Sequence, residues 1–221
     1  LHKEYRRQRQ MCIRDSYKSS DSQDLLLAKV YYGLQMQLLT YLEAAKEMVE
    51  KEHEGKEAVP AAMLYYVIKE KNLDWKPESE EEYEKRVLDS MKCKGYVNEE
   101  PEIIGHLDKS VVNGGELIPG QKSGVVPVAV DKKGLLKKNS GTLSTKDFET
   151  LIAHTKEKMK ECGKAILDGK IEAIPYVYED NDGCTYCPYG SVCGHESKKD
   201  GVREMKKMSD DEVWEALYGD N

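Results

Sequence analysis

Three cysteines near the C-terminus have the spacing of a metal or iron–sulfur site: Cys184, Cys187 and Cys193, in the pattern Cys-x2-Cys-x5-Cys. Thiolates at such short intervals can converge on one soft metal centre, and both zinc and cubane iron–sulfur clusters usually take four protein ligands. These cysteines therefore leave one coordination position open. We expect the fourth ligand to come from elsewhere in the fold or from a part of the protein beyond this chain.

Several identities for this site stay open at the level of sequence. His195 would complete a zinc site of three thiolates and one imidazole, whereas Cys162 or Cys93 would complete an all-thiolate site. The plain alternative is that the thiols are unrelated. A disulfide framework is disfavoured, because six cysteines in 221 residues without an apolar signal-peptide or membrane-length stretch indicate a reducing, cytoplasmic setting.

The composition is that of an acidic, globular chain. It has 39% hydrophobic and 34% charged residues, and its formal net charge is -7. These apolar residues can bury one substantial core, but the surface as a whole would repel DNA, so any contact with nucleic acid must be local. We interpret each basic patch as an ordinary solvated surface, because acidic residues lie close to most of them. The patches are Arg6 to Arg9, Lys132-Lys133 with Lys137-Lys138, and Lys198-Lys199 with Lys206-Lys207.

Hydrophobic periodicity predicts an order of strand, helix and strand in the first part of the chain. Residues 17–20 have the pattern of a strand end, and apolar residues then recur every three or four positions from Leu27 onward. This recurrence predicts one long helix that ends near Gly55. Residues 59–68 are rich in β-branched and aromatic side chains, as in a buried strand. The order indicates an α/β fold in which a helix packs on a mixed or parallel sheet.

Further elements are predicted downstream. Two helices should begin with a serine that is followed three residues later by an acid, Ser144 with Asp147 and Ser209 with Glu212. The predicted elements are a charged helix over 80–94 that Gly95 ends, a strand over 125–130, a helix over 144–168, and a short helix after residue 209.

The N-terminus is unlike the rest of the chain. Residues 10–16, Gln-Met-Cys-Ile-Arg-Asp-Ser, resemble the translation of a transposon-type sequencing adapter. On this interpretation native sequence begins near Tyr17, and residues 1–16 are an adapter-derived or disordered arm. A short Arg-rich natural arm is the alternative. In either case Cys12 is a weak candidate as a cluster ligand.

Four stretches together resemble one known family. They are Tyr-Lys-Ser-Ser at 17–20, the run from Val30 to Leu42, Ala-Ala-Met-Leu-Tyr-Tyr at 61–66, and Cys-Pro-Tyr-x3-Cys at 187–193. Together they are similar to the C-terminal nuclease domain of the AddB-type subunits of bacterial helicase–nuclease complexes, from Tyr17 to about His195.

The resemblance implies a restriction-endonuclease-like fold with a P-D…(D/E)-x-K active site, of which this chain carries a part. It also implies a 4Fe–4S cluster held by four cysteines. In that family the first cluster cysteine lies far upstream of the nuclease motifs. A fragment that begins here would therefore carry three cluster ligands, Cys184, Cys187 and Cys193.

The resemblance also implies a Mg2+-dependent hydrolytic site. Two carboxylates of such a site hold Mg2+, which activates a water, and a lysine orients the nucleophile. Lys18 matches the family's lysine, but Ser16 stands where the resemblance implies an acid, two residues earlier on the same strand face. Asp15 would need a bulge to reach that face. We interpret the missing acid as an effect of the adapter junction, with a naturally degenerate site as the alternative.

Gln37 and Tyr41 match the family's Q-x3-Y motif. Residues four apart lie on one helix face, so the amide and the phenol could both reach the rim of an active site or the DNA backbone. Taken alone, either residue could belong to the surface or the core. Together with Lys18 upstream, we favour a functional role for both.

The resulting hypothesis is a fragment of a DNA exonuclease subunit in a helicase–nuclease complex that acts in double-strand break repair and recombination. The resemblance implies DNA and an AddA-type helicase–nuclease subunit as partners and gives no role to a membrane. We expect a partial nuclease domain over 17–200 and a tail with a short helix over 201–221. Without the acid, the chain as written is expected to be nearly inactive.

Two alternatives stay open. The first is a zinc-stapled structural or DNA-docking module without catalysis, in which Lys18 is incidental. The second is an iron–sulfur exonuclease of the CRISPR-adaptation type, but there the cysteines follow the Q-x3-Y helix much sooner than they do here.

Overall fold

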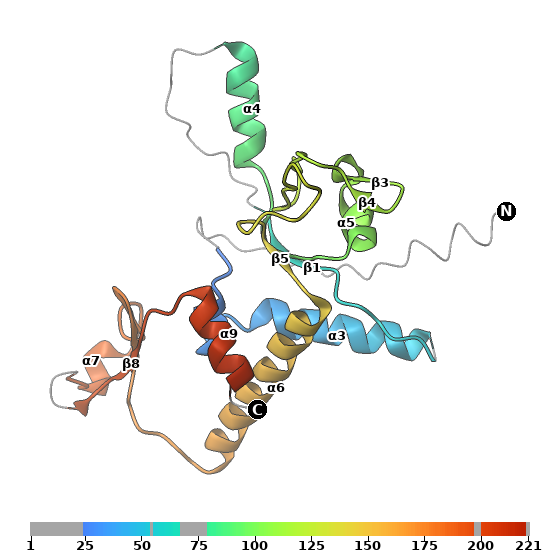
Figure 1. The fold of residues 1–221 in the computed structure, drawn as a ribbon. Coiled ribbons are helices and arrows are strands. Elements are labelled where there is room, and N and C mark those ends of the chain that lie inside the picture. Colours follow the sequence, from blue (N-terminus) through green and yellow to red (C-terminus); the bar gives the residue numbers. More distant parts are fainter. Residues whose placement is uncertain (1–23, 54, 67–78, 197–199, 220–221) are drawn as a thin grey trace. The chain divides into compact units, whose positions relative to one another are not determined.

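The computed structural model describes residues 24–53, 55–66, 79–196 and 200–219 (Figure 1). These residues belong to two compact units, the first made of residues 24–25 with 37–152 and the second of residues 26–36 with 153–219. Each unit combines helices with short strands, which confirms the predicted α/β class. The strand end predicted at 17–20 lies outside the described residues, and so do Asp15, Ser16 and Lys18.

A mixed sheet of three strands forms the centre of the first unit. Its strand order is β1-β2-β5, with β1 (Ala62–Tyr65) antiparallel to β2 (Lys94–Asn98) and β5 (Thr142–Leu143) parallel to it. Helix α3 (Gln37–Glu52) contacts β1, which confirms the prediction of a helix on a mixed sheet. The strand predicted over 59–68 is shorter in the structure, because regular pairing ends at Tyr65.

Helix α4 (Glu80–Ser90) is shorter than the predicted helix over 80–94. It begins with a capping box, in which the Ser79 hydroxyl accepts from the Glu82 amide and the Glu82 carboxylate accepts from the Ser79 amide. None of its side chains is buried. The helix ends at Ser90, so Gly95 is not its stop signal.

Gly95 instead belongs to strand β2, where it pairs with Leu64. Its φ is +126°, and a Cβ at this position would lie 2.3 Å from the carbonyl oxygen of Met63. Only glycine fits this conformation and this close approach without strain. The prediction that Gly95 ends a helix was wrong. A close approach between paired strands and the end of a helix both favour glycine, so the residue type alone does not distinguish them.

The hydrophobic core of the first unit joins β2 to helix α5 (Pro101–Leu107) and to the loops that follow it. Its fully buried members are Val97, Ile104, Val111, Val126 and Val128. After α5 come a short 3-10 helix, η1 (Lys109–Val111), and a hairpin of strands β3 (Val112–Asn113) and β4 (Glu116–Leu117).

Residues 125–130 bury alternate side chains without forming a strand. Val126, Val128 and Val130 are 2%, 1% and 0% exposed, yet the amide of Val128 donates to the carbonyl of Val126 across a tight turn. Pro127 between them has no N–H for a strand ladder. The prediction of a strand was wrong, since a bent and buried loop produces the same alternation of apolar residues.

The long helix predicted from Leu27 to near Gly55 consists of two helices, α2 (Leu27–Tyr31) and α3. Gly33 separates them with a φ of +77°, and the amide of Leu34 donates to the carbonyl of Lys29 at 2.7 Å. This hydrogen-bond pattern closes a helix end. The break makes Gln37 the first residue of α3.

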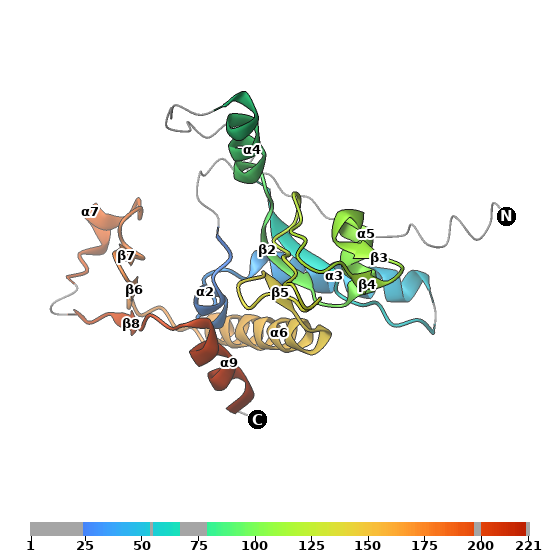
Figure 2. The ribbon, with the colours of Figure 1, turned by 45° about the horizontal axis from the view of Figure 1, so that its top comes forward.

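The second unit contains a sheet of strand order β7-β6-β8 (Figure 2). Strand β6 (Tyr176–Tyr178) pairs antiparallel with β7 (Asn181–Asp182) and parallel with β8 (Arg203–Met205). Helix α2 contacts α9 (Asp210–Gly219), and Leu27, Val30, Val213 and Leu217 are buried on these two helices.

Helix α6 (Thr145–Leu167) begins in the first unit and continues into the second. At its start, the Ser144 hydroxyl donates to the Asp147 carboxylate at 2.6 Å and accepts from the Asp147 amide at 3.1 Å. Ser209 and Glu212 make the same contacts before α9. Both predicted N-termini are confirmed. Within the described ranges, no helix combines the length and the apolar character needed to cross a membrane.

Candidate functional site

The residues with predicted chemical roles lie in both units. Gln37 and Tyr41 belong to the first unit, and the three clustered cysteines belong to the second. Lys18, which the resemblance makes the central residue of the nuclease site, is outside the described residues. Its role therefore stays a prediction.

Gln37 and Tyr41 contact each other on the first turn of α3. The side-chain amide nitrogen of Gln37 donates to the phenol oxygen of Tyr41 at 3.1 Å. Gln37 is exposed and Tyr41 is half-buried, whereas Leu39 between them is buried. The prediction that the amide and the phenol share one helix face is confirmed. Because this polar pair lies on the accessible side of α3, it could meet a ligand without moving out of a core.

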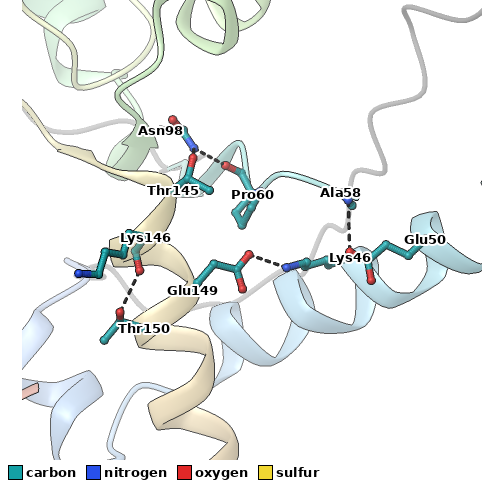
Figure 3. A network of polar contacts seen from close by, with 9 residues as sticks. All are labelled: Lys46, Glu50, Ala58, Pro60, Asn98, Thr145, Lys146, Glu149 and Thr150. Atoms are coloured by element: carbon teal, nitrogen blue, oxygen red, sulfur yellow. Dashed lines mark hydrogen bonds and ion pairs between the residues drawn. The ribbon is translucent and has the colours of Figure 1, made fainter. Parts of the chain in front are cut away.

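An ion pair fixes α3 to α6. The ammonium group of Lys46 donates to the carboxylate of Glu149, and the Lys46 side chain is only 15% exposed (Figure 3). Burial alone would lower the pKa of Lys46, but the hydrogen bond to Glu149, with the charges of Glu149, Glu50 and Glu43, outweighs it and raises the pKa. The helix that carries Gln37 and Tyr41 is therefore held to α6 by a charged contact.

A buried asparagine joins three more segments of the same unit. The side-chain amide of Asn98 donates to the Pro60 carbonyl at 2.9 Å and to the Thr145 hydroxyl at 2.8 Å (Figure 3). Its carbonyl oxygen accepts from the Glu100 amide at 3.0 Å. Asn98 is 0% exposed, and these bonds use both kinds of polar atom in its side chain. It connects the end of β2 to the entry of β1 and the start of α6.

Sequence reasoning identified neither of these two anchors. Lys46 and Glu149 are 103 residues apart, and Asn98 and Thr145 are 47 apart. Neither pair has a local pattern. A polar Asn98 directly after Tyr96 and Val97 is a weak cue in the sequence, and it does not reveal the partners of the side chain.

Cys184 and Cys187 lie on the turn-rich segment between β7 and helix α7 (Gly190–Cys193), and Cys193 is the last residue of α7. The carboxylate of Asp182 accepts from the Cys184 amide at 2.8 Å and from the Thr185 amide at 2.6 Å. The amide of Cys187 then donates to the carbonyl of Cys184 at 3.0 Å. One aspartate thus shapes the backbone at the first cysteine of the cluster, a role that the Cys-x2-Cys spacing did not predict.

All three thiols are exposed. The pKa of Cys184 is raised, first by desolvation and then by the negative charges of Asp182, Cys187 and Cys193. In the described part of the chain, no three His, Cys, Asp or Glu side chains are arranged to hold a metal ion. Thiolates are ligands that soft metals prefer, so the donor atoms fit such a metal, but these side chains do not form a coordination set in the described part of the chain.

The possible fourth ligands differ in their surroundings. The His195 side chain is 5% exposed, its Nδ1 lies 3.7 Å from the Asp200 carboxylate, and its buried Nε2 has no hydrogen-bond partner among the described residues. Cys162 is exposed on α6. Cys93 is half-buried in the first unit, where desolvation raises the pKa of its thiol. Among these candidates, His195 has a buried polar atom without a hydrogen-bond partner in the part of the chain that the structure describes.

The model of the PD-(D/E)XK nuclease superfamily matches residues 4–194, which include the Q-x3-Y helix and all three clustered cysteines.

Curated relatives are named as one of the subunits of an ATP-dependent helicase/deoxyribonuclease. The relative from Lachnoclostridium phytofermentans is 35% identical over 205 residues, which are 91% of this chain and 17% of the relative. That from Thermoanaerobacter sp. is 33% identical over 204 residues, again 91% and 17%. That from Clostridioides difficile is 30% identical over 207 residues, 92% and 17%. The chain thus spans about a sixth of the length of these relatives, 17% in each.

Proposed function

Because the chain belongs to the PD-(D/E)XK nuclease superfamily, we propose that it is part of a DNA exonuclease subunit of a helicase–nuclease complex. The observation that carries this proposal is 35% identity, over 91% of the chain, to a protein named as one of the subunits of an ATP-dependent helicase/deoxyribonuclease. The complex would act in double-strand break repair and recombination in the cytoplasm, with an AddA-type subunit as its partner and DNA as its substrate. The Gln37–Tyr41 pair on an exposed helix face supports it.

The proposed reaction is hydrolysis of a phosphodiester. Mg2+, held by two carboxylates, would supply an activated water and offset the charge that develops on the phosphate. Lys18 would orient the nucleophile, and Gln37 and Tyr41 would position the DNA backbone. Since Ser16 stands where an acid is implied, we propose that this chain as written has little of that activity.

We propose that Cys184, Cys187 and Cys193 would hold a 4Fe–4S cluster with a fourth cysteine from the longer parent protein. The cluster would cross-link the segments that carry its cysteines. Its binding free energy would then contribute to the free energy of folding. The exposed thiols on a backbone already turned by Asp182 support this role.

A second candidate is a zinc-stapled module without catalysis. One observation favours it: the buried Nε2 of His195 lacks a hydrogen-bond partner among the described residues, two positions after Cys193. Imidazole nitrogen with three thiolates is an ordinary zinc donor set. The two candidates differ in colour and metal content, since zinc proteins are colourless and iron–sulfur proteins are brown.

The experiment that tests the function uses the intact parent protein with its helicase partner and a natural acid before Lys18. Lys18→Ala should abolish Mg2+-dependent degradation of linear DNA while ATP-driven unwinding continues, because hydrolysis and translocation use separate sites. If Lys18→Ala left exonuclease activity intact while unwinding failed, the assignment of this segment to the nuclease centre would be wrong.

A further inference from the structure

One surface loop of the first unit carries four lysines, and we propose that it is a contact site for the phosphate backbone of DNA. The basic loop consists of residues 131–138, Asp-Lys-Lys-Gly-Leu-Leu-Lys-Lys. The proposal rests on the proposed nuclease function and names a surface through which the substrate would be held. It replaces our interpretation of Lys132-Lys133 and Lys137-Lys138 as an ordinary solvated surface.

The backbone of the basic loop is fixed at both ends. The Asp131 amide donates to the Leu135 carbonyl at 2.7 Å, and the Lys137 amide donates to the Ala129 carbonyl at 2.9 Å. Val130, directly before the loop, is 0% exposed and forms an antiparallel bridge with Leu136. The lysines are thus presented on a short hairpin that is anchored in the core.

The single acid of the loop is occupied by the loop itself. The Asp131 carboxylate accepts from the Lys133 amide at 2.7 Å and from the Leu135 amide at 3.0 Å. These bonds close the turn, as in other aspartate-closed turns. One carboxylate offsets at most one of the four lysine charges, so the loop keeps a net positive charge.

The four lysines of the loop are exposed, and no ion pair joins any of them to another residue in the described ranges. Other lysines of the chain are paired, such as Lys122 with Asp89 at 3.5 Å and Lys160 with Glu157 at 3.1 Å. Leu135 is 63% exposed, whereas Leu136 packs against the hydrophobic core of the unit.

Charge complementarity identifies the partner. The chain as a whole has a net charge of -7 and repels a polyanion, yet this loop places four ammonium groups against one internally bonded carboxylate. Lysine side chains that neutralise phosphates release condensed counterions, which provides sequence-independent affinity. An exonuclease that degrades DNA of any sequence needs binding of this kind. An acidic protein surface is the competing partner, and the experiment distinguishes it.

The test measures binding of a fluorescently labelled linear duplex to the 221-residue chain by anisotropy, over a range of NaCl concentrations and in EDTA so that no DNA is cut. The loop variant replaces Lys132, Lys133, Lys137 and Lys138 by Gln. The matched control variant replaces the same number of ion-paired lysines by Gln, namely Lys51, Lys122, Lys158 and Lys160. Both variants lower the net charge equally, and circular-dichroism melting confirms that each is folded.

We expect the loop variant to bind about tenfold more weakly or worse at low salt, with a salt slope shallower by about 0.9 for each lost phosphate contact. The control variant should bind within about twofold of the unaltered chain, since its lysines already have partners. Replacement of the four loop lysines by Arg should retain binding. Poly-L-glutamate should compete poorly with DNA.

The proposal would be overturned if the loop variant bound DNA like the unaltered chain, if the control lost as much affinity, if the unaltered chain bound no DNA, or if poly-L-glutamate competed as well as DNA. Failure of the proposed nuclease function is a separate result, read from cleavage after Lys18→Ala in the parent. If the loop variant bound DNA normally and the parent cleaved DNA normally, the basic loop would be ruled out as a DNA contact site, and the proposed nuclease function would be unaffected.

Discussion

The side-chain amide of Gln37 donates to the phenol oxygen of Tyr41 across 3.1 Å, one turn apart at the start of α3. The helix break after α2 makes Gln37 the first residue of a new helix, and the pitch of that helix brings Tyr41 beside it. A hydrogen bond between the two side chains orients both polar groups toward the same side. They would therefore act on one ligand group together.

In the intact parent with an acid before Lys18, Gln37→Ala should lower kcat/KM for DNA cleavage by about 1–3 kcal/mol of transition-state stabilisation. The free energy of unfolding should change little, because Gln37 is exposed. Lys51→Ala, at the other end of α3, is the matched control and should leave kcat/KM unchanged.

Tyr41→Phe separates the two interpretations of the phenol. If the variant cleaves DNA normally but is less stable, Tyr41 is a core residue.

Replacing Lys46 by Met should destabilise the 221-residue chain by about 1–2 kcal/mol in urea unfolding, because Glu149 loses a charged partner in a half-buried position. Lys51→Met on the same helix is the control. Its ion pair with Glu47 spans 3.9 Å between exposed side chains, so the loss should be below about 0.5 kcal/mol. Equal losses in the two variants would contradict an anchoring role for the Lys46–Glu149 pair.

The predictions from sequence that the structure confirms depend on local geometry. The caps at Ser144 and Ser209 need a serine and an acid three residues apart, and the Gln37–Tyr41 contact needs only the pitch of a helix. Each of these signals lies within one turn of the chain. The mixed α/β class followed from the alternation of helix-like and strand-like periodicity.

The wrong predictions arose where one residue pattern has two structural solutions. Apolar residues continue at helical intervals across Gly33, so periodicity could not reveal the break. The alternating valines of residues 125–130 fit both a strand and a buried loop. The contacts of Asn98 and of Lys46 join residues far apart in sequence, and only the folded chain brings them together. Lys18 lies outside the described residues, so its role stays a prediction.

Gly95→Ala should destabilise the chain by about 2–4 kcal/mol, because the added Cβ would lie 2.3 Å from the Met63 carbonyl oxygen at a φ of +126°. Gly163→Ala on α6 is the matched control, because the added Cβ would contact nothing within 4 Å beyond the adjacent backbone of its own helix, and it should raise stability by up to about 1 kcal/mol. Thermal or urea unfolding measures both. Similar stability of the two variants would mean that β1 and β2 do not pair closely at Gly95.

The 221-residue chain as written should degrade linear DNA poorly in Mg2+, because the hydroxyl of Ser16 carries no charge to hold the metal. Ser16→Asp alone should not restore activity, since the resemblance places the second carboxylate upstream of Tyr17. The assay is loss of a labelled linear duplex with and without EDTA. Robust Mg2+-dependent degradation that Lys18→Ala abolishes would mean that Asp15 or another acid substitutes.

The three clustered cysteines lead to a prediction about the metal content of the intact parent. If Cys184, Cys187 and Cys193 hold a 4Fe–4S cluster, the anaerobically prepared parent should contain about four irons per chain and absorb visible light. Replacement of any one of them by Ala should remove the iron, the colour and the cooperativity of unfolding together, because the binding free energy of the cluster is part of the folding free energy.

Two further variants distinguish the possible ligand sets. Cys162→Ala, which removes an exposed thiol on α6, is the matched control and should retain iron and colour. His195→Ala should also retain iron if the fourth ligand is an upstream cysteine, whereas it should release the metal from a zinc site of three thiolates and one imidazole. Stoichiometric zinc without iron, lost on His195→Ala, would replace the iron–sulfur cluster with the zinc module and would give the buried Nε2 of His195 its missing partner.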